Sequence, residues 1–417
     1  MKRYGVAVVG GGFSGVAAAI SAARAGADVI IIEKSNCFGG AAANCLVNPF
    51  MPFTTKINGE RVELSAGIFK EICNALKARG AYGMQNDSFL EEELKYILQE
   101  MLVDAGAKIL LHAYLSSVEC EGGTVTSATF ATRGGALTVE ADYFIDATGD
   151  AQLAYLAGFE TRLGREADNL CQPMTLCFRL GNCDVDRFYA SRPALAAAYR
   201  AARESGEITN PRENVLVFKT PIKNVLHFNT TRVILKNPTS AEDVSEAEII
   251  ARRQVYEIYD FMKRHADGLE DSYLMMSAAE IGVRESRMIV GEYVLTEEDC
   301  KGLARFDDAI AACNYDIDIH NPEGSGTSHY YFADGDYYTI PYRSLIPRGS
   351  KNLLVAGRCI SSDHGAQASY RIMPVVTTLG EAAGLGAALA KKNASGVSEI
   401  DISVLRSTLV SNGAFIG

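Results

Sequence analysis

Short apolar runs separated by glycines mark the start of the chain. Residues 4–9 form an apolar run typical of a buried strand, and a glycine-rich turn at 10–15 leads into a series of small helix formers. Gly26 predicts the end of that helix, because glycine readily takes the left-handed conformation after a last helical turn. A second apolar run, 28–32, ends at Glu33. The pattern predicts strand, turn, helix and strand, followed by an acid.

Alternation of apolar and polar residues appears in the middle of the chain. Three runs with glycine pairs at their turns predict a β-meander: 113–119, 124–132 and 136–140. A further strand is predicted from residue 143 into a glycine turn at 148–149, and another from 352 to Gly357. Met373-Pro374 opens a stretch of small residues over 375–390, where proline suits the first turn of a helix.

The segments between these runs predict further helices and strands. An apolar stripe at helical spacing over 90–101 places the charge run Glu91-Glu92-Glu93 on a solvated helix face. Ser245 and Glu248 match a capping box, which predicts a helix from there to about His265. Runs around 175–180 are β-like.

Composition limits the class of protein. The chain has 417 residues, of which 48% are hydrophobic and 22% charged, which is enough for two packed domains without bulk disorder. The net charge of −11 gives no basic footprint, so we expect neither nucleic acid nor a membrane surface as a partner.

Targeting signals and cysteine spacing indicate the cellular location of the protein and the state of its thiols. We find no secretory signal and no apolar stretch of the roughly 18 residues that a membrane helix needs. The ten cysteines are scattered and none has C-x-x-C spacing, which argues against a zinc ribbon, an iron–sulfur cluster or a dithiol pair. We therefore expect free thiols, no metal site and a cytoplasmic location.

The first glycine turn has the features of a dinucleotide-binding unit. Gly10 permits a tight turn, Gly12 lets the backbone approach a pyrophosphate, and Gly15 allows close packing of helix and strand. The helix that begins around Phe13 and Ser14 offers unpaired N–H groups and a positive dipole end to phosphates. Glu33 is placed to bind a ribose diol, which disfavours NADP but does not separate NAD from FAD.

Three later segments favour FAD. Glu33-Lys34 is followed by Gly39-Gly40-Ala41, an order typical of FAD enzymes with two domains. The strand ending in Ala147-Thr148-Gly149 and the strand ending in Gly357-Arg358 add two more glycine turns. The helix opened by Met373-Pro374 would aim its positive end at the flavin. A second complete fingerprint, as needed for tightly held NADPH, is missing from the sequence.

Together these motifs resemble the FAD-dependent oxidoreductase family related to the flavin domain of heterodisulfide reductase and, more distantly, to fumarate-reductase-type flavoproteins. The resemblance covers nearly the whole chain. It rests on CLVNPFM at 45–51, IDATGD at 145–150, QPMT at 172–175, RESR at 284–287, and the run from YTIPYRSL at 338 through GRCIS at 357 to RIMP at 371–374. The four-cysteine cluster motif of heterodisulfide reductases is missing, which argues against heterodisulfide chemistry.

The resemblance implies an α/β fold of two domains: a Rossmann-like FAD domain with a central parallel sheet plus β-meander, and an inserted α+β substrate domain. We assign 1–50, 85–160 and 335–417 to the FAD domain, and 51–84 and 161–334 to the substrate domain. The cofactor-binding residues that we predict are Gly10, Gly12, Phe13, Ser14, Gly15, Glu33, Lys34, Gly39, Gly40, Ala41, Leu115, Ala147, Thr148, Gly149, Gly357, Arg358, Arg371, Ile372 and Met373.

His364 and Arg371 are the candidate catalytic residues. They lie in the loop that we expect against the flavin ring, where a histidine can exchange the proton that accompanies hydride transfer. An arginine there can hold an anionic substrate group or the reduced flavin. The alternative is that His364 only bonds the backbone and Arg371 only braces the loop.

Further polar and aromatic groups have more than one interpretation. Alternation places Asp316, Asp318 and His320 on one strand face, where we favour a polar domain interface over a metal site. Arg284 and Arg287 either pair with a substrate carboxylate or with Glu280 or Glu285. A tyrosine group is either core or substrate wall: Tyr330, Tyr331, Tyr337, Tyr338 and Tyr342. Cys45 lies close enough to the paired glycines for a covalent flavin link, which we disfavour.

The leading hypothesis is an FAD-dependent oxidoreductase that transfers hydride between flavin and a small organic substrate, with an unidentified electron donor or acceptor. Three alternatives stay open: a fumarate-reductase-like reductase of an activated C=C bond, a flavin-binding protein that relays electrons to a partner protein, and an NAD-using protein of the thiazole-synthase kind. A homo-oligomer is compatible with the sequence.

Overall fold

A mostly parallel sheet forms the centre of the computed structural model, which describes residues 3–84 and 86–417. Its parallel strands lie in the order β7-β2-β1-β10-β21. Their bounds are Arg3–Val9 for β1, Val29–Ile32 for β2, Lys108–Leu110 for β7, Gly135–Asp146 for β10 and Leu353–Val355 for β21. The predicted α/β class is confirmed. The domain assignment stays a prediction, and its residues 1, 2 and 85 lie outside the described chain.

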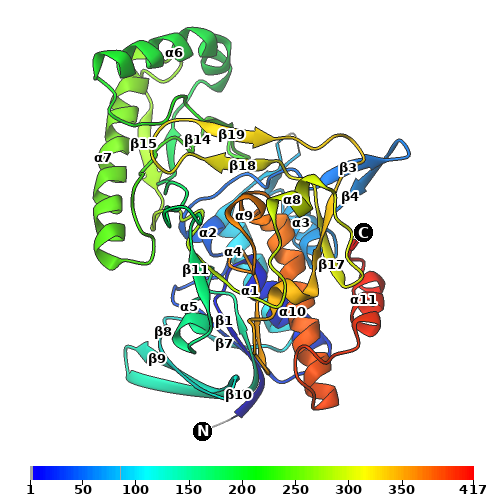
Figure 1. The fold of residues 1–417 in the computed structure, drawn as a ribbon. Coiled ribbons are helices and arrows are strands. Elements are labelled where there is room, and N and C mark those ends of the chain that lie inside the picture. Colours follow the sequence, from blue (N-terminus) through cyan, green and yellow to red (C-terminus); the bar gives the residue numbers. More distant parts are fainter. Residues whose placement is uncertain (1–2, 85) are drawn as a thin grey trace.

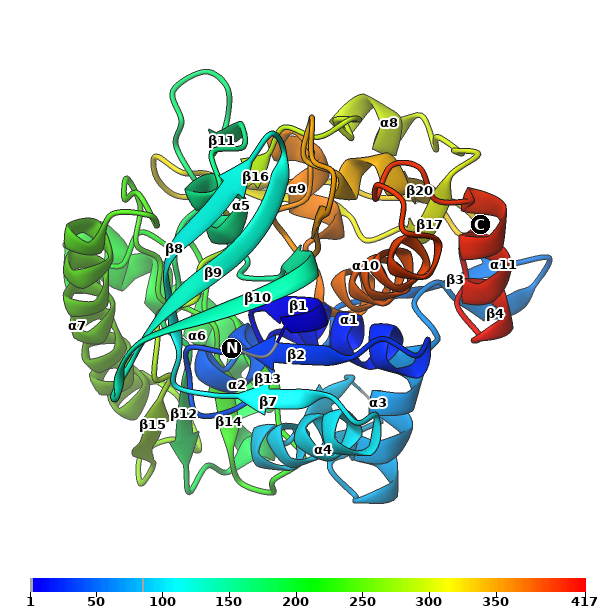
Figure 2. The same ribbon diagram turned by 90° about the horizontal axis from the view of Figure 1, so that it is seen from below.

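β10 belongs to two layers at once. Its first half pairs antiparallel with β9 (Thr124–Thr132), which pairs with β8 (Tyr114–Glu121), and these three strands form the predicted meander. Its second half runs parallel to β1, with Val9 opposite Asp146. The runs expected separately at 136–140 and from 143 are therefore one continuous strand, which bends across the molecule in Figure 2.

Alternate residues of β1 face two different hydrophobic layers. Val6 and Val8 join the core cluster that contains α1 (Phe13–Arg24) and α10 (Met373–Asn393). Ala7 and Val9 join the smaller cluster under the meander. A strand buried on both faces needs an uninterrupted apolar run, which is why this segment does not alternate with polar residues.

α1 and α10 pack against each other through glycines. A Cβ atom at Gly380 would overlap the backbone of Ser14, and one at Gly384 would overlap the backbone of Ala18. Absent side chains therefore let two helices from opposite ends of the chain touch by their backbones. α10 is long and apolar enough to span a membrane by length and composition, but 89% of that stretch is buried within the fold. It is the central core helix of the protein.

Other elements complete this larger core. The helices are α2 (Ala41–Asn44), α3 (Ile68–Ala78), α4 (Glu91–Asp104), α5 (Gln152–Leu156), α8 (Glu297–Lys301), α9 (His364–Tyr370) and α11 (Ile402–Ser411), with a short 3-10 turn at Tyr342–Leu345. The small antiparallel pairs are β3 (Thr54–Ile57) with β4 (Glu60–Glu63), β5 (Tyr82–Gly83) with β6 (Ser88–Phe89), β11 (Thr161–Leu163) with β16 (Arg287–Ile289), β17 (Ala309–Cys313) with β20 (Tyr338–Pro341), and β18 (Ile317–His320) with β19 (Thr327–Tyr330).

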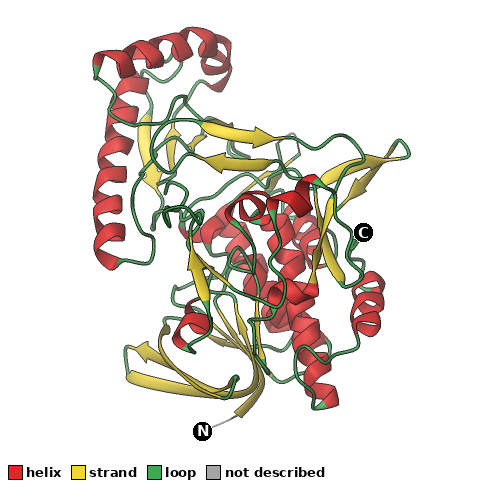
Figure 3. Cartoon of the chain, in the orientation of Figure 1, coloured by secondary structure: helices red, strands yellow, loops and turns green. Residues whose placement is uncertain are grey.

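A second hydrophobic core belongs to an inserted segment, residues 174–283, which we call the cap. Its antiparallel sheet has the order β13-β14-β12-β15. These strands are β12 (Phe178–Gly181), β13 (Val217–Lys219), β14 (Leu226–Phe228) and β15 (Tyr273–Ser277). The long helices α6 (Val185–Ser205) and α7 (Ala241–His265) cover it on the outer side of the molecule (Figures 1 and 3). The inserted α+β unit is thus present.

Two local predictions are wrong. α7 begins at Ala241, because Ser240 accepts a hydrogen bond from the Asp243 N–H, whereas Ser245 already lies inside the helix. Glu91 is 4% exposed instead of solvated. It forms an ion pair with Arg179 of the cap, so the helix face that carries it meets protein. A charge run shows that a face is polar, but not what lies opposite it.

Candidate active site

A cavity of about 260 Å³ opens at the carboxyl ends of the parallel strands. This edge of an open α/β sheet is where such folds bind ligands. Val9, Ile32, Ala147 and Gly357, at or just beyond the ends of β1, β2, β10 and β21, all line it. Every predicted cofactor residue lines it too, except Gly15 and Ile372. The structure therefore brings four separated glycine turns to one place.

The first turn is held tightly against the end of β10. Gly10 has a φ of +107°, and a Cβ atom there would overlap the carbonyl of Ala147. A Cβ atom at Gly15 would overlap the carbonyl oxygen of Gly10, so Gly15 serves packing and not the cavity wall. Gly12 differs: a Cβ atom there would have only Gly40 Cα in reach, at 3.9 Å. Its open side faces the cavity.

Two helices begin at the cavity without a capping side chain. Gly12 precedes α1 and Ile372 precedes α10, and neither provides a side-chain hydrogen bond to the first turn. No acidic residue lies in either first turn. Their N–H groups and positive dipole ends are therefore available to negative groups in the cavity. Ile372 contributes this cap position although its side chain does not line the cavity.

Glu33 stands at the end of β2 and is 7% exposed. Its Oε2 accepts a hydrogen bond from the Gly11 N–H at 2.5 Å, and its Oε1 accepts from the Ser35 N–H and hydroxyl at 2.8 Å. The carboxylate thus fixes the glycine turn as well as facing the cavity. Its neighbour Lys34 forms an ion pair with Glu280 of the cap, at 2.9 Å, across the mouth of the site.

The guanidinium group of Arg358 lies over the turn that follows β10. Arg358 binds Asp150 through Nη2 at 2.7 Å, and a Cβ atom at Gly149 would lie 2.7 Å from its guanidinium. Buried Asp146 organises the same turn by accepting from Thr148 N–H, Thr148 hydroxyl and Ala154 N–H. Asp150 lines the cavity and was not predicted, although it follows directly after the Thr148-Gly149 motif.

The two predicted catalytic residues flank the short helix α9. Arg371 follows its last residue and lines the cavity, with Nη2 3.7 Å from Asp318 Oδ2. His364 is its first residue, instead of lying in the expected loop, because Asp363 caps the helix. His364 Nδ1 lies 2.7 Å from Oε1 of Glu285, which is fully buried. The histidine does not line the cavity.

Residues of the cap and of its interface with the main domain complete the lining of the cavity. Glu280, Ile281 and Val283 line it, and so does Cys45, whose thiol donates to the Ile281 carbonyl at 3.6 Å. Burial raises the pKa of Cys45 to about 12, so it is a thiol at neutral pH. Sequence reasoning did not predict these cap residues, because a run such as 280–283 carries no chemistry of its own.

The remaining polar and aromatic groups singled out in the sequence have different surroundings in the structure. Neither Arg284 nor Arg287 pairs with Glu280 or Glu285, which bind Lys34 and His364 instead. Tyr338 and Tyr342 are buried in the core, whereas Tyr331 is 72% exposed. Asp318 and His320 interact on one face of β18, with His320 Nε2 3.3 Å from Asp318 Oδ2. Among the described residues no cluster has the composition of a metal site.

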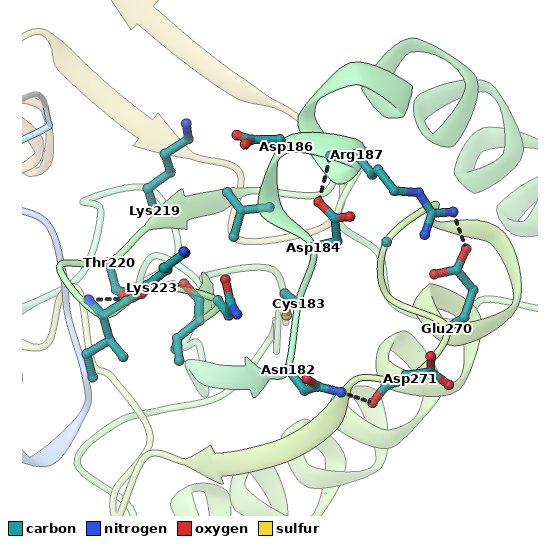
Figure 4. A pocket seen from close by; sticks show the side chains of 15 residues that line it. Asn182, Cys183, Asp184, Asp186, Arg187, Lys219, Thr220, Lys223, Glu270 and Asp271 are labelled. Atoms are coloured by element: carbon teal, nitrogen blue, oxygen red, sulfur yellow. Dashed lines mark hydrogen bonds and ion pairs between the residues drawn. The ribbon is translucent and has the colours of Figure 1, made fainter.

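A larger hollow of about 700 Å³ lies elsewhere in the cap and shares no residue with this cavity. Figure 4 shows that a few of its polar groups bind one another. Arg187 pairs with Glu270 at 2.8 Å, Asp184 accepts from the Arg187 N–H, and Asn182 donates to the Asp271 carbonyl. None of the glycine turns at the strand ends lines this hollow, so we place the chemistry at the strand ends.

The residues at the strand ends fit FAD. The uncapped N-terminus of α1 suits its pyrophosphate, and that of α10 suits negative charge on the flavin. Gly12 leaves room for close approach, and Arg358 Nε is buried without a partner in the described protein. The chain matches the model of the family described as FAD dependent oxidoreductase over residues 5–409, and it belongs to that family. It is an enzyme of this class, and its cofactor is FAD.

A solved structure agrees on the fold. A geranylgeranyl bacteriochlorophyll reductase-like protein from Thermoplasma acidophilum aligns with a TM-score of 0.50 and 16% identity, over 99% of this chain and 85% of the other. A flavoprotein/dehydrogenase from Cytophaga hutchinsonii aligns with a TM-score of 0.45 and 12% identity, over 99% and 86%. No curated protein matches the chain.

Proposed function

We propose that this FAD-dependent oxidoreductase transfers hydride between its flavin and a small organic substrate held between the cavity and the cap. The observation that carries this proposal is that Arg371, the N-terminus of α10 and the cap residues Ile281 and Val283 line or adjoin the same cavity as the glycine turns. FAD supplies the hydride-accepting or hydride-donating chemistry when it is bound. The protein supplies orientation, charge and proton transfer.

α10 and Arg371 account for charge at the reacting end. The first turn of α10 has no acidic residue and no capping side chain, so its dipole favours negative charge beside Met373. Arg371 adds a full positive charge at the same wall of the cavity. Both features favour an electron-rich cofactor and an anionic substrate group in this space.

His364 is proposed as the proton-transfer group. Its Nδ1 contacts buried Glu285, an arrangement that leaves Nε2 available to exchange a proton. Because His364 does not line the cavity, we propose that it reaches the substrate from the cap side or through one water molecule. Glu285 is a positioning residue, since it also accepts from the Gln172 N–H at 2.9 Å and is held from two sides.

The finer relationship to the flavin domain of heterodisulfide reductase and to fumarate-reductase-type proteins is kept as a proposal, supported by the motifs at 284–287 and 338–374. We also propose a cytoplasmic enzyme that uses a diffusible electron donor or acceptor. The net charge of −11 supports a role without nucleic acid or an anionic membrane. The oligomeric state follows from no feature of this site.

The test starts from the purified protein. It should carry flavin absorbance at about 450 nm. An anaerobic screen of candidate substrates, followed by flavin bleaching or recolouring, should find at least one reactive class. His364→Ala should retain FAD and slow that step by about 100-fold. A colourless protein that takes up no added FAD contradicts the proposal, and unchanged kinetics of the variant remove His364 from it.

A further inference from the structure

Three arginines from distant parts of the chain gather beside the cavity. Arg212 belongs to the cap, Arg284 is the first residue after the cap, and Arg371 is the first residue after α9. Val283 and Arg371 line the cavity, so Arg284 is one residue removed from its wall. Gln367 joins two of them, because its side chain donates to the Arg284 carbonyl at 2.9 Å and its own carbonyl accepts from the Arg371 N–H at 3.3 Å. Burial, and then the charges of Arg371 and Arg212, lower the pKa of Arg284 to about 9.

Arg284 is held by neutral partners alone. Its Nη1 donates to the Pro173 carbonyl at 2.7 Å and to the Thr175 hydroxyl at 2.6 Å. Its Nη2 donates to Asn229 Oδ1 over a long 3.4 Å. Over residues 3–84 and 86–417, no carboxylate forms an ion pair with it. The guanidinium is positioned but its charge is not balanced.

The other two arginines carry unsatisfied donors. Arg212 is 5% exposed, binds Asn214 through Nε at 3.2 Å, and keeps Nη1 buried without a hydrogen-bond partner in the described protein. Arg371 contacts Asp318 through Nη2, while its Nε is buried and likewise without a partner there. Buried donors left unpaired cost free energy, so native proteins seldom keep two side by side unless a ligand or water completes them.

The carboxylates near Arg212, Arg284 and Arg371 carry too little negative charge to balance the three guanidinium groups. Asp318 is the carboxylate that contacts Arg371, at 3.7 Å, and it also binds His320 at 3.3 Å and the Tyr315 hydroxyl at 3.3 Å. Burial lowers the pKa of His320 to about 3, so it is neutral and adds no charge. Glu213 lies nearest to Arg232, at 3.4 Å. A net positive charge remains at the cavity end.

The groups around the three arginines are partly open to solvent. Arg284, Arg371, Asn229 and Tyr315 keep partial solvent exposure, whereas Arg212, Thr175, Asp318 and His320 around them are buried. The planar donor forks of arginine match the two oxygens of a carboxylate better than any other side chain does.

We propose that Arg212, Arg284 and Arg371 form the binding site for a carboxylate of the substrate, beside the flavin end of the cavity. This inference rests on the proposed function and names the substrate class: a small organic acid whose reacting carbon lies toward the flavin and whose carboxylate lies toward the cap. A bound carboxylate accounts for the positive charge of this cluster and for the unpaired donors of Arg212 and Arg371.

Thermal unfolding with small probes tests this proposal. Because the chain has no Trp, unfolding is followed by circular dichroism on the FAD-loaded protein. Malonate should raise the Tm, whereas malonamide, of similar shape without charge, should not; chloride keeps the ionic strength constant. In Arg284→Gln and Arg212→Gln the Kd for malonate should rise about tenfold or more, because a charge-assisted hydrogen bond is lost.

Arg187→Gln is the matched control, since it removes an exposed arginine of the cap that pairs with Glu270. It should respond to malonate like the natural protein. The inference is overturned if malonate has no effect on the FAD-loaded protein, if Arg284→Gln responds equally, or if inorganic phosphate alone protects. Should either glutamine variant fail to fold, the malonate and malonamide comparison decides. A protein without flavin instead contradicts the proposed function, whatever malonate does.

Discussion

The carboxylate of Glu91 at the start of α4 and the guanidinium of Arg179 on β12 form an ion pair in which both side chains are almost completely buried. Asn48 Nδ2 donates to the same carboxylate at 2.8 Å. The pair joins the helix beneath the main sheet to the central strands of the cap. It joins the cap to the main domain through charge, in addition to apolar contact such as that of Leu46 with the cap core.

Breaking this pair should cost more than an ordinary surface change. Arg179→Gln leaves a buried carboxylate without its counter-charge, and the expected loss is about 3–5 kcal/mol in the free energy of unfolding. Urea denaturation followed by circular dichroism measures it. Glu92→Gln, next to it but on a side chain that is 83% exposed, should change stability by about 0.5 kcal/mol or less. Equal effects of the two variants would contradict the role of the pair.

Gly12→Ala should separate folding from cofactor binding. The added Cβ atom meets only Gly40 Cα, at 3.9 Å, so the apo-protein should fold with nearly unchanged Tm. The same methyl group occupies the path of the pyrophosphate, so FAD affinity should fall by about 100-fold or more. Flavin absorbance after gel filtration measures the loss. Gly134→Ala, in a meander turn with open space around it, should bind FAD normally; normal binding by Gly12→Ala would place the cofactor elsewhere.

Glu381, on α10, predicts a pH-dependent stability. It is 2% exposed and accepts from the Ile68 N–H at 3.1 Å. Burial raises its pKa from 4.5 to about 7. Since the folded state holds this proton more tightly than the unfolded chain, its contribution is complete at low pH and is lost as pH rises from about 4.5 to about 7, by roughly 3 kcal/mol.

Glu381→Gln keeps an acceptor for Ile68 and removes the charge. The variant should match the natural protein at about pH 5 and exceed it in stability at about pH 8. Chemical denaturation at several pH values reports the difference. Glu60→Gln, on the exposed strand β4, serves as the control and should show no such divergence. A constant offset between Glu381→Gln and the natural protein would show that the carboxyl is not titrating in this range.

Acid precipitation should release the yellow colour into solution. Cys45 reaches the cavity, but its pKa of about 12 keeps the thiol protonated and its hydrogen bond to the Ile281 carbonyl holds it in place. A thiol forms covalent bonds through its thiolate, so a flavin link is disfavoured. Absorbance of the supernatant and pellet measures the release. Colour retained by the pellet of the natural protein but lost in Cys45→Ser would contradict this expectation.

Much of the cofactor cavity could be predicted because its motifs are local. Gly10, Gly12 and Glu33 lie within one strand–helix–strand unit, where spacing along the chain determines position in space. The later turns at Gly149 and Gly357 follow apolar runs, and parallel strands place their carboxyl ends at one edge. The predicted strands and the helix after Met373 are therefore found where the pattern puts them.

The substrate half could not be predicted in the same way. Arg212, Arg284 and Arg371 meet only after the cap has folded onto the main domain, and nothing in the spacing between them reveals this. Glu91 shows the converse problem, since a partner 88 residues away turns an apparently solvated charge into a buried one. His364 was expected in a loop because it follows the strand ending at Gly357 and precedes Met373, but the Asp363 carboxylate starts a helix there by accepting from the Ala366 N–H.

The continuous strand β10 places a constraint on the length of the chain. Because its residues 135–140 pair with β9 and its residues 140–146 pair with β1, inserting or deleting one residue within it would shift one of these registers. Such a slip turns the side chains on one side of the change to the opposite face, so either the meander pairing or the alignment of Asp146 with Val9 would be lost. Length variation among natural variants of this enzyme should therefore collect in the hairpin at Gly134, outside the strand.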